Sequence, residues 1–174
     1  MPAPASLIEQ QMAVLMAADT ALDSLKRLYL GVPYHVPTQD HPYAVIVVDN
    51  EETEKEYTGN RVVRVYSGAI IINVFHQDIP EVVTERIARV PSYTVMRDLV
   101  DDVVKLFKAT ANRNLAGFTF TGGTVQIMII GDDLIEYGIS AQPERGTGQS
   151  ARTESFSNYG IVPFAVKTME AMAL

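Results

Sequence analysis

Apolar residues near the start of the chain recur at three- and four-residue steps, which is the spacing of one face of an α-helix. Ser6 and Glu9 match a capping box before this stretch, and Gly31 and Pro33 after it are residues that end helices. The pattern therefore predicts a helix over residues 7–29. Its apolar stripe consists of Ile8, Met12, Leu15, Leu22, Leu25 and Tyr29.

A second helical pattern occupies residues 93–109, and Ser92 is placed to cap its first turn. Its apolar face comprises Met96, Leu99, Val100, Val103 and Phe107. Charged residues fall mostly on the other face, namely Arg97, Asp98, Asp101, Asp102, Lys105 and Lys108. This separation of the two kinds of residue predicts an amphipathic helix packed on a core.

Between the two helices the pattern changes to that of strands. Residues 43–48 form a β-branched run typical of a buried strand, residues 49–56 indicate an acidic turn, and residues 61–75 predict a second strand. At about 3.3 Å per residue the second strand would span roughly 50 Å, more than the ~40 Å diameter of a compact domain. We therefore expect a bulge or bend at Gly68, with protrusion of the acidic end as the alternative.

Strand patterns also dominate the rest of the chain, at residues 117–121, 124–130, 134–141 and 156–168. Residues 142–154 have no large apolar side chain, so a mobile loop is expected there, as is a flexible N-terminus at residues 1–6. The helices come singly and the strands in hairpin-linked pairs. The sequence thus predicts an α+β fold in which two main helices pack on a mainly antiparallel β-sheet with a long hairpin.

Composition favours a single domain over residues 1–174. A chain of 174 residues can bury roughly two thirds of its unfolded surface, so it can fold without disulfides, and it contains no cysteine. The formal charge of −7 argues against a dense basic face for nucleic acid. Residues 1–10 lack the segments of a secretory signal, and glycines interrupt the uncharged stretch at 114–131, so we expect no membrane span.

Asp132 and Asp133 are the first candidates for catalysis, because paired carboxylates are typical of metal-dependent enzymes. They follow Gly131 and stand between two apolar runs, which is the context of a hairpin turn. No spacing in the sequence brings further carboxylates or histidines to them. We therefore expect this pair to form a turn and to do no chemistry.

The other candidates for chemistry have simpler interpretations. His35, His41 and His76 match no ligand spacing of a metal site. Residues 121–124 lack the lysine of a phosphate loop, so their glycines predict a tight connection between strands, and no serine lies in a hydrolase elbow motif. A solvated acidic hairpin tip is expected at Glu51, Glu52, Glu54 and Glu56. The sequence predicts no enzyme, no cofactor and no bound metal.

The order of the elements resembles that of the tail terminator, or tail completion, proteins of long-tailed bacteriophages. The matching pieces are the run at 42–46, the strand at 61–75, the helix at 92–108 and the closing strand at 159–164. With the intervening pattern the resemblance covers residues 7–168.

The resemblance implies a structural virion protein without catalytic residues. Proteins of that family form a hexameric ring on the head-proximal end of the tail tube, stop tube growth, and join the tube to the head-tail connector or stopper protein. The implied partners are further copies of the chain, the tail tube protein and the connector, in a virion tail assembled in the host cytoplasm and without a membrane. DNA would pass through the lumen without specific binding, because six copies at −7 each carry about −42.

In such a ring, candidate contacts with a neighbouring subunit or the tube are Glu144, Arg145 and Arg152, which lie on the predicted mobile loop and would become ordered on contact. Two other functions stay open. A head-tail stopper or a tail tube protein would share the β-rich architecture and ring assembly. A small metal-dependent enzyme would act through Asp132, Asp133 and the acidic cluster.

Overall fold

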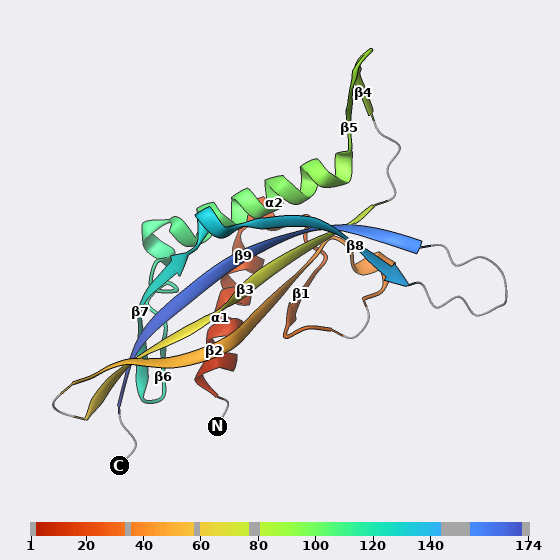
Figure 1. Ribbon diagram of the computed structural model, residues 1–174. Coiled ribbons are helices and arrows are strands. Elements are labelled where there is room, and N and C mark those ends of the chain that lie inside the picture. The colour runs from red at the N-terminus through yellow and green to blue at the C-terminus, as the bar shows by residue number, and fades with distance from the viewer. Residues whose placement is uncertain (1–2, 34–35, 58–59, 77–80, 144–153, 172–174) are drawn as a thin grey trace.

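The computed structural model describes residues 3–33, 36–57, 60–76, 81–143 and 154–171. Two α-helices in these ranges, α1 (Pro4–Ala18) and α2 (Pro91–Lys108), lie over one face of a curled sheet (Figure 1). The strands are β1 (Arg27–Leu30), β2 (Tyr43–Tyr57), β3 (Arg61–His76), β4 (Glu81–Thr84), β5 (Ile87–Arg89), β6 (Thr119–Phe120), β7 (Gly123–Ile130), β8 (Glu136–Pro143) and β9 (Glu154–Ala171). None of the helices described is long and apolar enough to cross a membrane.

The main sheet has seven strands in the order β1-β2-β3-β9-β7-β6, and β8 also pairs with β9. All of these pairs are antiparallel except that of β1 with β2. The long strand β9 therefore holds the sheet together, with β3 along one edge and both β7 and β8 along the other. This architecture confirms the predicted α+β fold with two helices on a mainly antiparallel sheet.

The predicted acidic turn at residues 49–56 is wrong, because these residues continue β2. β2 pairs with β3 from Tyr43 opposite Asn73 to Tyr57 opposite Arg61. Backbone hydrogen bonds to β3 and cross-strand contacts override the weak strand propensity of the charged residues. The two residues between these strands, 58 and 59, lie outside the described residues.

The irregularity predicted at Gly68 falls on the partner strand. The pairing shifts by one residue between Val48 and Asn50, opposite Gly68 and Ser67. A Cβ atom on Gly68 would collide with the carbonyl group of Val47 on the partner strand, so glycine is required at this position. Such a bulge increases the local twist, which agrees with the curl of the long strands in Figure 1.

The hydrophobic core lies between the helices and the covered face of the sheet. The apolar face predicted for α2 is confirmed, and Val103 is completely buried. Alternate side chains of β3 and β9 pack against the helices, including Ile70, Ile72, Val162 and Val166. Gly160 allows α2 to lie close to β9, because a Cβ atom there would overlap the side chain of Val100.

The first helix is shorter than predicted, since α1 ends at Ala18. The carboxylate of Asp19 accepts a hydrogen bond of 2.9 Å from the amide of Ala21 and so caps a new 3-10 turn that places Leu22 in the core. The chain then forms β1 beside β2. Apolar residues at helical spacing therefore come from three successive elements, and the residues after 18 were wrongly assigned to the helix.

The predicted capping box is also absent. Pro4 begins α1, so the helix starts three residues before the predicted position, and its N-cap Ala3 has no side-chain bond. The Glu9 carboxylate accepts a hydrogen bond of 2.8 Å from the amide of Val48. A side chain expected to cap its own helix instead ties α1 to β2.

Asp132 and Asp133 do not form a hairpin turn, because β7 and β8 do not pair with each other. Both strands pair with β9 end to end, β7 along residues 164–170 and β8 along residues 154–161. A 3-10 turn, Asp132–Leu134, joins them, and the amide of Gly131 keeps a bond of 2.9 Å to the carbonyl of Pro163. The long partner strand accommodates both pieces, so the chain never reverses there.

Candidate assembly surface

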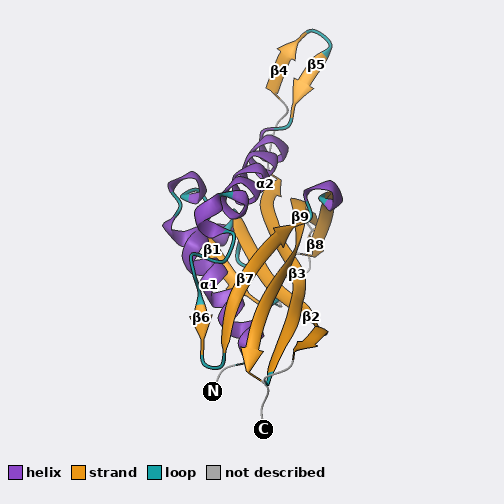
Figure 2. Ribbon diagram, turned by 90° about the vertical axis from the view of Figure 1, so that its left-hand side faces the viewer, coloured by secondary structure: helices purple, strands orange, loops and turns teal. Residues whose placement is uncertain are grey.

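A short hairpin projects from the body of the molecule just before α2, and Figures 1 and 2 both show it standing clear of the sheet and the helices. It consists of β4 and β5, residues 81–89, and we call it the arm. Its register pairs Glu81 with Arg89 and Val82 with Ala88. Every residue of the arm is exposed.

The exposed residues of the arm include large apolar side chains. Val82 is 78% exposed and Ile87 is 58% exposed. A two-stranded hairpin is marginally stable by itself in water, and exposed apolar clusters commonly mark interaction sites. The arm therefore has the exposed apolar composition that is typical of an element packed against another surface.

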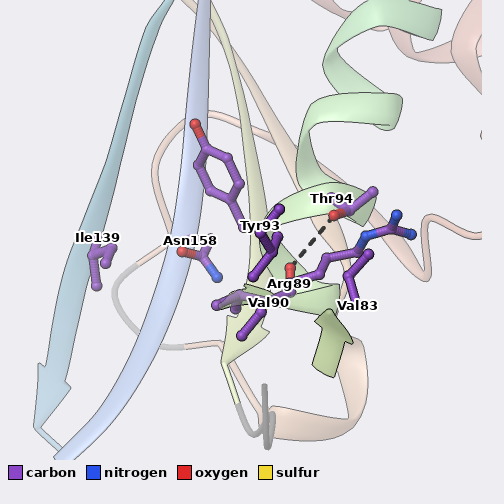
Figure 3. A pocket seen from close by; sticks show the side chains of 9 residues that line it. Val83, Arg89, Val90, Tyr93, Thr94, Ile139 and Asn158 are labelled. Atoms are coloured by element: carbon purple, nitrogen blue, oxygen red, sulfur yellow. Dashed lines mark hydrogen bonds between the residues drawn. The ribbon is translucent and has the colours of Figure 1, made fainter. Parts of the chain in front are cut away.

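An open cleft of about 520 Å³ lies at the base of the arm. Figure 3 shows Ile139 on the strand side of the cleft and Val83 and Arg89 on the arm side. The cleft is lined by Val83, Ile87, Ala88, Arg89, Val90, Tyr93, Thr94, Ile139 and Asn158. Most of these side chains are apolar, so the cleft suits packing by apolar groups better than recognition of a charged ligand.

Polar bonds fix the wall of the cleft. The Asn158 side-chain amide donates a hydrogen bond of 2.8 Å to the Ser92 hydroxyl, and both residues are buried. Ser92 was predicted to cap α2, but Val90 is the N-cap and Pro91 the first helical residue. Proline is well suited to the first position of a helix, which frees Ser92 to anchor α2 to β9.

The acidic residues do not gather at a hairpin tip as predicted. Glu51, Glu52 and Glu54 are exposed along β2. Glu51 pairs with the Arg64 guanidinium, and Glu54 lies 2.7 Å from the Lys167 ammonium. The side chain of Glu56 lies outside the described residues. Glu51, Glu52 and Glu54 thus spread along a strand, and two of them, Glu51 and Glu54, pair with cations on β3 and β9.

A buried polar cluster joins β3 to β9. The Glu170 carboxylate accepts hydrogen bonds from the Tyr66 hydroxyl at 2.8 Å and the Thr168 hydroxyl at 2.7 Å, and Arg64 lies 3.4 Å away. Burial, followed by the bond to Glu170, raises the pKa of Tyr66 above the ordinary value for tyrosine. The cluster balances a buried carboxylate, which is a structural role.

The remaining candidate ligands are dispersed. Asp133 is exposed on its turn, whereas nothing is described of the Asp132 side chain. The ring of His41 lies 4.8 Å from that of Tyr43. His35 and the side chain of His76 lie outside the described residues. Across the part of the chain that the structure describes, no three acidic or histidine side chains come close enough to hold a metal ion.

Two sequence-based expectations concern loops. The tight connection predicted at residues 121–124 is confirmed, because Phe120 pairs with Gly123 across the turn between β6 and β7. The candidate partner contacts Glu144, Arg145 and Arg152 lie outside the described residues.

The arm was missed in the sequence because its apolar residues are few and lie among four charged ones. The available signal was the pair Val82 and Val83 followed closely by Ile87, a β-branched group too short for a strand of the main sheet. No protein-family model matches the chain, and no curated protein matches it in sequence. The geometry shows exposed apolar side chains in two adjoining places, the arm and the cleft.

Proposed function

We propose that the protein is a structural subunit of a phage tail, which forms a ring that caps the head-proximal end of the tail tube and joins it to the head-tail connector. The observation that carries this proposal is the projecting arm, residues 81–89, whose apolar side chains face solvent. Exposed apolar side chains on a projecting hairpin are typical of a surface that a second molecule covers.

The rest of the fold fits this proposal. Long strands clamped by β9 make a rigid body, and rigid bodies joined by projecting elements suit assemblies with fixed geometry. The order of the elements supports the proposal as well, since an N-terminal helix precedes a pair of long strands, a central amphipathic helix and a set of returning strands. The arm adds the element through which the copies would associate.

The first test measures self-association. The purified chain should form a ring of defined size in negative-stain images and a matching mass in light scattering. A Val82→Asp, Ile87→Asp variant should stay folded, because neither side chain contacts the core, and should shift to the monomer. A Val14→Asp variant, which places one aspartate at an exposed position of α1 away from the arm, is the control and should still form rings.

A second test addresses the tail. Added to the polymerising tube protein of the same phage, the ring should halt tube growth, whereas the arm variant should not. A chain that stays monomeric at high concentration, or an arm variant that assembles normally, would remove the proposal. A ring that joins the growing tube without stopping it would identify a tube or stopper protein instead.

A further inference from the structure

We propose that the arm of one copy docks on the helix-free face of the sheet of a second copy. The receiving surface, which we call the open-face patch, consists of Ile127, Ile129, Leu134, Pro163 and Ala165. This inference rests on the proposed self-association and adds to it the surface that receives the arm.

Register places the patch on the face opposite the helices. Ile129 lies across from Ala165, and Ile127 lies across from Lys167. The core residues Met128 and Ile130 alternate with these two and point to the helices, so Ile127 and Ile129 must point away from them. The Leu134 side chain lies beside Gly131 and Pro163 at the end of the same row.

The open-face patch is unusually apolar for a sheet surface without a cover. An antiparallel sheet with one solvated face normally alternates apolar and polar residues. Here four outward positions carry isoleucine, proline and alanine, with Lys167 beside them opposite Ile127, and Leu134 is 69% exposed while Ile129 is 46% exposed. An outward face with this composition indicates a surface that another molecule covers.

Charge favours the arm of another copy as that molecule. Each chain carries −7, so two copies repel each other over most of their surfaces. The arm holds two glutamates and two arginines and is therefore neutral, and the open-face patch has no charged member. At the edge of the patch, Glu136 lies opposite Ile161 and Lys167 lies opposite Ile127, and the Lys167 ammonium pairs with Glu54 of the same chain. Neither surface carries a net charge, so contact between them adds little to the repulsion between acidic copies.

The apolar surface of the arm continues into the body of the molecule. Tyr93 and Ile139 line the cleft together with Val83 and Ile87 of the arm. A partner that covers the arm can therefore also fill the cleft.

The arm cannot contact the open-face patch of its own copy. The arm leaves the molecule at the start of α2, on the side covered by the helices (Figure 2), and the patch lies on the opposite face. Contact between two different surfaces is heterologous, and repeated contacts of that kind close into rings or grow into filaments. The placement of the surfaces therefore agrees with cyclic assembly.

Disulfide trapping tests this contact, because the chain has no cysteine to interfere. Ile87→Cys protein and Ile129→Cys protein of different tagged mass are mixed and oxidised. A covalent dimer containing one copy of each should dominate the products. Ile87→Cys mixed with Val14→Cys is the control and should yield little heterodimer.

Each outcome has a distinct meaning. If the unmodified chain does not self-associate at all, the proposed function and this inference fail together. If association is normal but Ile87→Cys alone gives the main covalent dimer, the arms meet each other and only this inference is wrong. If Ile87→Cys forms as much heterodimer with Val14→Cys as with Ile129→Cys, this inference is wrong as well.

A complementation experiment provides a second measurement. Ile129→Asp should weaken self-association by about tenfold or more, because the contact would bury an unpaired charge. Mixed with the Val82→Asp, Ile87→Asp variant, it should form dimers but no rings, since the mixture retains one intact arm and one intact patch per pair. If each variant stays monomeric in the mixture while both remain folded, the arm does not dock on this patch.

Discussion

At the scale of single residues, the function of a polar side chain depends on partners that are distant in the sequence. Glu9 and Ser92 both have the spacing of helix caps, yet Glu9 bonds to β2 and Ser92 to β9. Tyr66 and Glu170 are 104 positions apart and share a buried hydrogen bond. Local patterns identify residues able to form such bonds, and only the fold decides which partner they meet.

The Tyr66 hydroxyl is expected to stabilise the fold through Glu170. Tyr66→Phe would remove one of the two hydroxyl donors of a buried carboxylate, so the free energy of unfolding should fall by about 1–3 kcal/mol. Urea unfolding at neutral pH measures this loss. Tyr93→Phe, at an exposed ring, is the matched control and should change stability little.

The raised pKa of Tyr66 adds a dependence on pH. Below the ordinary tyrosine pKa of 10.0, the folded and unfolded chains both keep this proton, so the contribution is fully present. Above that pH the unfolded chain loses the proton first, and the free energy of unfolding falls. Burial also raises the pKa of Tyr29, so the decline should be shallower in Tyr66→Phe but not absent. Equal slopes in the two proteins would contradict the role assigned to the cluster.

At the scale of elements, prediction succeeded where the pattern was long and one-sided. The amphipathic pattern identified α2 within two residues at each end, and the strand patterns at 61–75 and 156–168 located β3 and β9. It failed for α1 and for the link between β7 and β8. In both places a short 3-10 turn interrupts the element, and three-residue turns leave almost no periodic signal. The arm was missed because its residues face no core.

The packing of α2 yields a direct test. Val103→Asp would bury an unpaired charge against β3 and β9, and we expect the domain to lose about 3–5 kcal/mol or to unfold. Val95→Asp introduces the same side chain on the exposed part of the same helix and should leave the melting temperature nearly unchanged. Similar melting temperatures for both variants would be inconsistent with this arrangement of the helix.

The turn between β7 and β8 should tolerate loss of its charges. Asp132→Asn together with Asp133→Asn keeps the size of both side chains, and the backbone bond from Gly131 to Pro163 remains. We expect unchanged stability in thermal unfolding and unchanged ring formation. A bound divalent ion or a catalytic activity that disappears in the double variant would instead support the enzyme hypothesis.

At the scale of the whole molecule, two acidic chains must overcome their mutual repulsion in order to associate. The structure places neutral apolar surfaces on opposite sides of the body, the arm next to the helices and the open-face patch on the helix-free face of the sheet. Association through them should depend on apolar burial, with the net charge acting only as an opposing term.

Ionic strength separates these two contributions. Salt screens the repulsion between copies that each carry −7, and it hardly weakens apolar contacts, so raising the salt concentration should tighten self-association. Analytical ultracentrifugation across a sodium chloride series measures the dissociation constant. An assembly held mainly by ion pairs would respond in the opposite way and dissociate as salt is added. The Val14→Asp control, which adds one negative charge away from the contact, should associate slightly more weakly at low salt and match the parent chain at high salt, because screening removes the added repulsion.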